Sequence, residues 1–157
     1  MELTYATVSS PVGLWTVEGS DAGLTHVLMP HEPAPGASPR PGAIVRDAAR
    51  QLDEYFRRGR RTFEVALAEV PATEFQRQVW LVLRSLPYGT VATYAQVAEL
   101  AQRPRAARAV GNANHANPWP VIVPCHRVVA SNGLGGYGGG EDVKRYLLTL
   151  EGGPPYP

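Results

Sequence analysis

Cys125 is the one cysteine of the 157-residue chain, and His126 and Arg127 follow it directly. A thiol reacts as its thiolate, and a neighbouring base or cation lowers its pKa from about 8.5 toward neutrality. Cysteines that serve only packing are also common, because free cysteine is among the most buried residue types. The adjacent base and cation favour a reactive thiol, and we expect His126 and Arg127 to lower the pKa of Cys125.

The residues around this thiol are apolar and rich in β-branched side chains, from Val121 to Val123 and again from Val128 to Ala130. Such a short run predicts a buried strand. Neighbours on a strand point to opposite faces, so a Cys–His hydrolase pair at this position would need a bend.

Length and composition restrict the classes of protein to consider. A chain of 157 residues with 44% hydrophobic and 18% charged residues is typical of one globular domain or two small ones. One cysteine forms no internal disulfide and no cysteine zinc cluster. We see no apolar stretch of about 20 residues and no signal peptide. We therefore expect a reducing, cytoplasmic location, no membrane partner, no metal and no organic cofactor.

Charge is unevenly distributed along the chain. The net charge is +1, but residues 1–73 have a balance of −2 and residues 74–157 a balance of +3. Six arginines and a single acid, Glu99, lie between Arg77 and Arg127. A basic segment of this kind is a modest signal for a polyanion, and a solvated face is the alternative.

The first half of the chain contains no evident chemistry. Residues 3–8, 12–18 and 23–29 predict a three-stranded antiparallel meander, and residues 43–57 have the apolar spacing of a helix. A further strand is expected at 62–70. Three carboxylates could be proposed as a pair-wise acid–base site but fit a solvated helix face better: Asp47, Asp53 and Glu54.

Composition changes at Pro71, which divides the chain into expected domains 1–70 and 71–157. Thr73 and Thr93 each precede a glutamine by three residues, which is the form of a capping box at a helix start. The second box opens a short helix to about Ala101, and a third helix is expected at 105–115. Two helices separated by a few residues form a helix-turn-helix pattern.

The third helix has small residues almost all round, and Arg108 projects among them. Small residues allow tight packing against neighbouring helices, which is the structural explanation. They also allow a slim helix to enter the minor groove, which is only about 6 Å wide. The composition of this helix leaves both interpretations open.

Two later segments complete the expected site. Residues 131–140 include six glycines around Leu134 and Tyr137, which permits close approach to a flat ligand. The last helix is expected to begin near Gly140 and to bury Val143, Leu147 and Leu150. Glu151 then lies at the negative end of that helix, where a carboxylate is disfavoured unless another group holds it.

The run Pro124-Cys125-His126-Arg127-Val128 resembles the active-site signature of the O6-alkylguanine-DNA alkyltransferases, and the likeness extends from about Phe75 to Gly152. It implies an α/β (α+β) two-domain fold, with a ribonuclease-H-like N-terminal domain and a mainly helical C-terminal domain containing the helix-turn-helix. It further implies direct repair of O6-alkylguanine, with O4-alkylthymine as a second substrate, in double-stranded DNA. The protein is expected to act as a monomer, with cooperation between molecules on DNA left open.

The same resemblance assigns roles to individual residues. Cys125 accepts the alkyl group, His126 takes the thiol proton through a water, and Glu151 orients the imidazole. Tyr94 protonates the departing guanine and crowds the neighbouring phosphate, and Arg108 fills the gap left by the extruded base. The remaining DNA-binding residues are Ala106, Ala107, Ala109, Thr93 and the hinge residue Asn117; the base pocket consists of Val128, Tyr137, Gly138 and Gly139.

Three other functions compete with this one. A non-catalytic lesion sensor resembles the same family with tryptophan in place of the cysteine, so Cys125 argues against it. A transcription-factor-like DNA binder would use Cys125 only structurally and would prefer a sequence rather than a lesion. A thiol hydrolase has the adjacency of Cys125 and His126 as its support.

Overall fold

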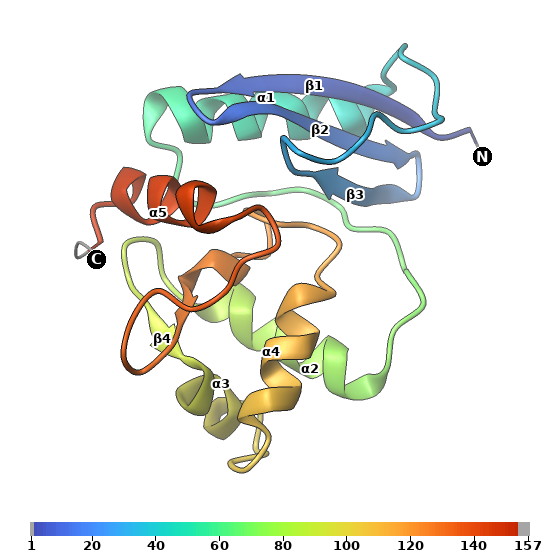
Figure 1. Ribbon diagram of the computed structural model, residues 1–157. Coiled ribbons are helices and arrows are strands. Elements are labelled where there is room, and N and C mark those ends of the chain that lie inside the picture. Colours follow the sequence, from blue (N-terminus) through green and yellow to red (C-terminus); the bar gives the residue numbers. More distant parts are fainter. Residues whose placement is uncertain (1, 154–157) are drawn as a thin grey trace. The chain divides into compact units, whose positions relative to one another are not determined.

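The computed structural model describes residues 2–153 and divides into two compact units, Met1–Pro71 and Ala72–Pro157. The chain is of mixed α/β class. Figure 1 shows the order of its helices and strands. Within the described residues, no helix is long and apolar enough to cross a membrane.

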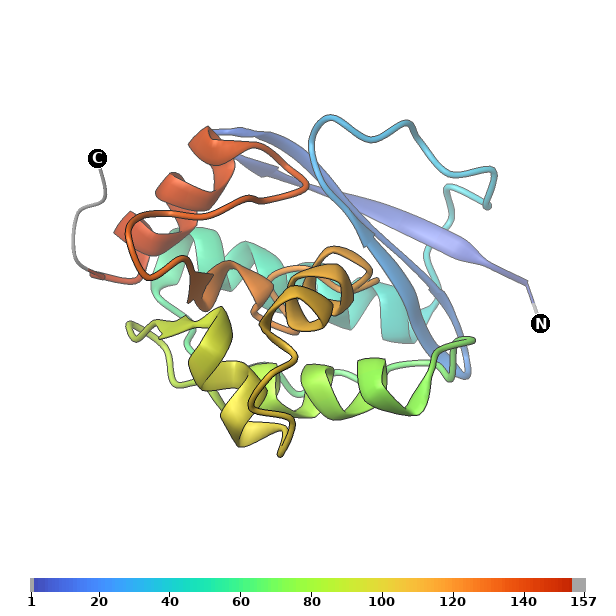
Figure 2. The ribbon, with the colours of Figure 1, turned by 60° about the horizontal axis from the view of Figure 1, so that its bottom comes forward.

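The first unit is an antiparallel sheet covered by one helix. Strands β1 (Thr4–Ser10), β2 (Gly13–Ser20) and β3 (Gly23–Leu28) pair in sequence order, which confirms the predicted meander. Helix α1 (Ala43–Arg58) lies along one face of this sheet (Figures 1 and 2). Its apolar stripe packs against the sheet, and Trp15 and Phe56 meet there with ring centroids 5.4 Å apart.

The prediction of a strand at residues 62–70 is wrong. This segment forms only one bridge, between Leu67 and Leu24. The reason is that a side chain takes the place of a partner strand. The Gln51 amide donates to the Glu64 carbonyl at 3.0 Å and accepts from the Glu64 backbone N–H at 2.9 Å, so a side chain satisfies the backbone of Glu64. Leu24 bonds to the Ala66 carbonyl and the Ala68 N–H, each at 2.9 Å, which makes the single bridge.

Up to residue 153, the second unit contains four helices, a 3-10 turn and a two-stranded parallel pair. Figure 2 shows three of the helices gathered together: α2 (Glu74–Ser85) in green, α3 (Tyr94–Leu100) in yellow and α4 (Ala107–His115) in light orange. Both predicted capping boxes are present, at Thr73 and Thr93. The last helix, α5 (Glu141–Leu150), begins directly after Gly140 as expected.

Helices α2 and α4 are joined through two tryptophans. The Trp80 indole donates to the Ala113 carbonyl at 2.9 Å, and its ring meets that of Trp119 edge-on at 5.7 Å. A buried indole N–H needs such a partner. Trp119 belongs to the segment that leads to Cys125, so this contact fixes the position of the chain just before the thiol.

The parallel pair brings the start of α3 to the segment after Cys125. Strand β4 (Ala92–Thr93) pairs with β5 (Val128–Val129), with Ala92 opposite Val128 and Thr93 opposite Val129. Tyr94 follows Thr93 directly. The pairing therefore places the first turn of α3 beside the residues that follow the thiol.

Candidate active site

Cys125 is the first residue of a 3-10 turn, Cys125–Arg127, so the prediction of a strand through the thiol is wrong. The strand begins only at Val128. Pro124 has no backbone N–H to give to a ladder, and it stands in a tight turn in which the Cys125 N–H donates to the Val123 carbonyl at 2.8 Å. The bend that adjacent cysteine and histidine side chains require is thus supplied by a 3-10 turn.

Val121 marks the beginning of this bend. Its φ is 75° and its side chain is buried, and a positive φ is a real outlier for a β-branched residue. Such conformations persist only where the surrounding structure imposes them. Here the turn is closed by a hydrogen bond of 2.8 Å from the Val123 N–H to the Trp119 carbonyl.

His126, Arg127 and Glu151 form one buried network. Nε2 of His126 lies 2.7 Å from Oε2 of Glu151. Arg127 holds the same carboxylate with two N–H groups, Nε at 2.8 Å and Nη2 at 3.0 Å. Its remaining amino group donates to the Leu86 carbonyl at 2.7 Å. A bidentate arginine makes strong, charge-assisted hydrogen bonds to a carboxylate, which favours the ionised form of Glu151.

The network also explains why an acid stands at the end of α5. The negative pole of the helix disfavours Glu151, but Arg127 offsets it, and the Gly89 backbone N–H approaches the carboxylate at 3.4 Å. The Arg127 guanidinium in turn lies over the ring of Tyr88, with its central carbon 5.7 Å from the ring centroid. Glu151 is therefore fixed from several sides.

These contacts determine which nitrogen of His126 accepts a proton. Because Glu151 is an acceptor, Nε2 of the neutral imidazole carries the hydrogen and donates it. Nδ1 is buried and has no hydrogen-bond partner among the described residues. Burial lowers the pKa of His126 more than the Glu151 carboxylate raises it. The resting imidazole is neutral, and its free Nδ1 can act as a base.

The thiol of Cys125 differs from the sequence expectation. Burial raises its pKa, and that effect exceeds the lowering by polar contacts from Asn117 and Tyr137 and by the charge of Lys144. The expectation that His126 and Arg127 depress the thiol pKa is therefore wrong. Cys125 rests as a thiol, so a base must remove its proton before it can act as a nucleophile.

Tyr94 is half-buried and its hydroxyl reaches the glycine loop. The backbone of Gly136 hydrogen-bonds this hydroxyl, while burial raises the Tyr94 pKa above its usual value. A Cβ on Gly135, whose φ is 77°, would stand 3.1 Å from the Tyr94 hydroxyl. Glycine is thus required where the loop meets Tyr94, which keeps a protonated phenol near Cys125.

The expected pocket residues lie along the segment after the thiol. Val128 is fully buried in β5, and Tyr137 is half-buried and is one of the side chains that act to lower the Cys125 pKa. Gly138 is exposed and Gly139 partly buried in the same loop. Figure 1 draws this loop in orange-red between β5 and α5.

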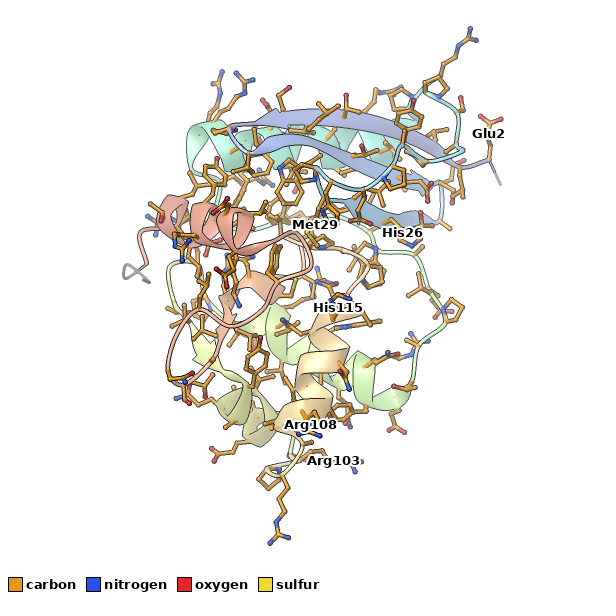
Figure 3. All side chains as sticks on the ribbon, in the orientation of Figure 1. Glu2, His26, Met29, Arg103, Arg108 and His115 are labelled. Atoms are coloured by element: carbon orange, nitrogen blue, oxygen red, sulfur yellow. The ribbon has the colours of Figure 1, made fainter. Side chains whose placement is uncertain are left out.

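Most of the residues expected to bind DNA lie at the exposed end of α4 and at the start of α3; Asn117 follows the other end of α4. Helix α4 begins at Ala107 rather than Arg105, with Ala106 as its N-cap residue. Arg108 and Ala109 are exposed, and Figure 3 shows Arg108 and Arg103 at one end of α4 with His115 at the other.

Two of the expected DNA-binding side chains are engaged inside the protein. The Thr93 hydroxyl caps α3 by accepting from the Gln96 N–H at 3.1 Å. Asn117 is buried; its amide donates to the Val123 carbonyl at 2.8 Å and accepts from the Trp119 N–H at 3.0 Å. Asn117 therefore braces the turn before Cys125, and any part it takes in DNA binding is indirect.

Sequence reasoning missed two interior polar residues beside the thiol. Asn114 of α4 donates to the Cys125 carbonyl at 3.1 Å. Lys144 of α5 is completely buried, and it precedes Leu147 and Leu148 by three and four residues. This helical spacing places Lys144 on the same face of α5 as the two leucines, and it was the one sequence signal that could have predicted its burial. Leu150, expected to be buried, is only partly so.

Comparison with known proteins agrees with this geometry. The family described as 6-O-methylguanine DNA methyltransferase, DNA binding domain, matches residues 74–153. The methylated-DNA–protein-cysteine methyltransferase of Methanosarcina acetivorans is 42% identical over 94% of this chain and 97% of that protein. The protein of the same name from Mycolicibacterium paratuberculosis is 44% identical over 95% of this chain and 92% of its own length.

Solved structures extend the likeness to the whole fold. The O6-methylguanine methyltransferase of Mycobacterium tuberculosis superposes with a TM-score of 0.84 at 40% identity, covering 95% of this chain and 92% of that one. The Mycobacterium tuberculosis OGT in complex with DNA gives the same TM-score at 42% identity, covering 95% and 93%. The chain belongs to the family of methylated-DNA–protein-cysteine methyltransferases.

Proposed function

We propose that the protein repairs O6-alkylguanine in duplex DNA by moving the alkyl group to its own Cys125. The observation that carries the proposal is the free Nδ1 of His126, whose Nε2 is held by Glu151, on the residue next to a buried thiol. A thiol with a raised pKa needs a base, and this arrangement provides one.

The transfer is a displacement at the alkyl carbon. The Cys125 sulfur gives its proton to Nδ1 of His126, through a bridging water, and the imidazolium is stabilised by Glu151. The sulfur electron pair forms the C–S bond as the bond from the alkyl carbon to O6 breaks. Tyr94 gives its hydroxyl proton to the departing guanine, and the proton held by His126 restores the phenol through solvent. No metal or organic cofactor enters these steps.

The lesion must leave the base stack, because the alkyl carbon is out of reach inside a duplex. Helices α3 and α4 are proposed to act as the helix-turn-helix, with α4 in the minor groove. Ala106, Ala107 and Ala109 keep its leading end slim, and the exposed Arg108 occupies the gap in the stack. The extruded base is expected to lie against Val128 and the loop of Tyr137, Gly138 and Gly139.

Several finer features belong to the same proposal. The first unit is expected to be a ribonuclease-H-like domain, and O4-alkylthymine a second substrate. The protein is expected to act as a monomer in a reducing, cytoplasmic location, since its single thiol must remain unoxidised.

The proposal is tested by mass analysis after incubation with duplex DNA that contains one O6-methylguanine. The expected result is one methyl group on the intact protein, located on the peptide with Cys125. Cys125→Ser should bind the same duplex and gain no methyl group. Binding that depends on DNA sequence and not on the lesion, without a protein adduct, would favour a transcription-factor-like role.

A further inference from the structure

The turn at residues 86–89, which follows α2, has no step in the proposed chemistry, yet it contacts the buried network at several points. The Leu86 carbonyl accepts from Nη1 of Arg127 at 2.7 Å. The Gly89 backbone N–H lies 3.4 Å from Oε1 of Glu151. The turn therefore contacts both members of the ion pair that Arg127 and Glu151 form.

Tyr88 adds two contacts, one through its ring and one through its hydroxyl. The central carbon of the Arg127 guanidinium lies 5.7 Å from the centre of the ring. An aromatic face attracts a cation at this distance, and more strongly where water is excluded. The hydroxyl donates at 3.3 Å to the carbonyl of Leu150, whose helix leaves its last carbonyls without internal partners. Leu150 directly precedes Glu151, so one side chain contacts the guanidinium and the backbone beside the carboxylate.

Gly89 shows how closely this turn is fitted to the end of α5. Its φ is 80°, and a Cβ there would stand 3.1 Å from the backbone carbonyl oxygen of Glu151. Glycine adopts such a φ without steric cost and allows the two backbones to approach. The turn is thus fitted to Glu151 through its backbone and to Arg127 through Tyr88.

The orientation of His126 depends on this ion pair. Nε2 of His126 lies 2.7 Å from the Glu151 carboxylate, which Arg127 holds with two N–H groups. Three charged groups act on the His126 pKa: Glu151 raises it, whereas Arg127 and Lys144 lower it. A carboxylate that turned away would no longer select the Nε2–H tautomer. The Nδ1–H tautomer cannot accept the thiol proton at that nitrogen.

We propose that Tyr88 is a positioning residue of alkyl transfer: through the buried ion pair that its ring supports, it keeps His126 in the tautomer that accepts the thiol proton. The ring holds the Arg127 guanidinium against the Glu151 carboxylate, and the carboxylate holds the Nε2–H group. Tyr88 itself exchanges no proton in this step. The inference rests on the proposed function for its role in repair, whereas the tautomer is a property of the protein without DNA.

The first measurement is the tautomer of His126, read from the nitrogen-15 chemical shifts of the imidazole in the full-length protein without DNA. The chain has four histidines, and His126→Gln identifies the signals of this one. We expect the wild type and Tyr88→Phe to show the Nε2–H form, because both keep the ring. Tyr88→Leu should show a mixture with the Nδ1–H form. A pure Nε2–H form in Tyr88→Leu would overturn the proposal.

The second measurement is a double-mutant cycle on the rate of single-turnover methyl transfer from duplex DNA. We expect Tyr88→Leu to slow transfer about tenfold at neutral pH, the factor that corresponds to the loss of one desolvated cation–π contact. In the His126→Ala background the same substitution should add no further loss, because no imidazole remains to be oriented. An equal loss in both backgrounds would show that Tyr88 supports the fold and not the base, and would contradict the proposal.

Tyr5→Leu is the matched control, since Tyr5 is a partly buried tyrosine of β1. It should leave the His126 tautomer and the transfer rate unchanged. If Tyr88→Leu does not fold, pentafluorophenylalanine at position 88 keeps the shape of the ring and reverses its quadrupole, so the guanidinium is no longer attracted. This variant should reproduce the tautomer mixture, and a wild-type tautomer in it would overturn the proposal. The tautomer measurement uses no DNA, so it stands even where repair itself is absent.

Discussion

Nε2 of His126 lies 2.7 Å from Oε2 of Glu151, although 25 residues separate the two in the chain. The same carboxylate receives two N–H groups of Arg127, which keeps it ionised. An ionised Glu151 fixes the imidazole as a donor at Nε2 and leaves Nδ1 as the acceptor. In the proposed transfer, the direction of proton flow from Cys125 thus depends on a residue at the far end of α5.

The first prediction concerns His126 as the base. His126→Ala should slow methyl transfer by about 10²–10⁴-fold, the usual contribution of a positioned base. The loss should shrink at alkaline pH, because hydroxide then ionises the thiol directly. Single-turnover rates between pH 6 and 10 measure both effects. Affinity for the methylated duplex, measured separately, should be nearly unchanged; an unchanged transfer rate at neutral pH would remove His126 from the mechanism.

The second prediction concerns the stability that Glu151 provides. Glu151→Gln leaves the Arg127 guanidinium buried beside a neutral amide, and breaking a buried ion pair costs about 3–5 kcal/mol. The free energy of unfolding in urea should fall by an amount of this order. Glu141→Gln, at the exposed start of the same helix, is the control and should change stability little. Equal losses in the two variants would show that the Glu151 network contributes nothing special.

The third prediction concerns pH and folding. Burial in the folded protein lowers the pKa of His126 below its usual value of 6.5. The unfolded chain therefore binds this proton at a higher pH than the native state does. Stability from the neutral imidazole is full above pH 6.5 and is lost as the pH falls toward the folded pKa, by at most about 1.4 kcal/mol per pH unit. The difference in unfolding free energy between wild type and His126→Gln should change with this sign between pH 7 and 5. A difference that stays constant would contradict it.

Much of the fold could be predicted because local signals agree with it. The capping boxes at Thr73 and Thr93 are complete within four residues, and the meander and α1 follow hydrophobic periods. The prediction of a strand at 62–70 is wrong: the Gln51 side chain satisfies the backbone of Glu64, and the segment makes only one bridge, to Leu24. No local sequence pattern predicts that a side chain takes the place of a partner strand.

Part of the grouping of the candidate site residues could be predicted from the sequence, but their electrostatics could not. Cys125, His126 and Glu151 were identified from sequence, and the structure places the last two within hydrogen-bond distance. The Cys125 pKa was expected to be low, yet burial raises it, because depth in the core is not visible in adjacent residues. Lys144 was missed for the same reason: a lysine is usually exposed, and its carbonyl partners come from another part of the chain.

The fourth prediction concerns Arg108 and base extrusion. Arg108→Ala should lose more activity on methylated duplex than on free O6-benzylguanine, which needs no flipping. Arg103→Ala is the matched control, because it removes one exposed positive charge near the same end of α4 (Figure 3). We expect this control to weaken DNA binding modestly without changing the ratio of the two activities. Equal losses on both substrates in Arg108→Ala would mean that Arg108 has only a structural part.

The central prediction is that each molecule acts once. Alkyl transfer converts the Cys125 thiol to a thioether, which has no ionisable proton and no activated bond for water to attack. The chain has no second cysteine to exchange with. The most direct test is to titrate a fixed amount of protein with excess duplex that carries O6-methylguanine and count the lesions repaired. We predict a plateau at one lesion per protein molecule with the methyl group on Cys125, whereas continued repair beyond one equivalent would contradict alkyl transfer to the protein itself.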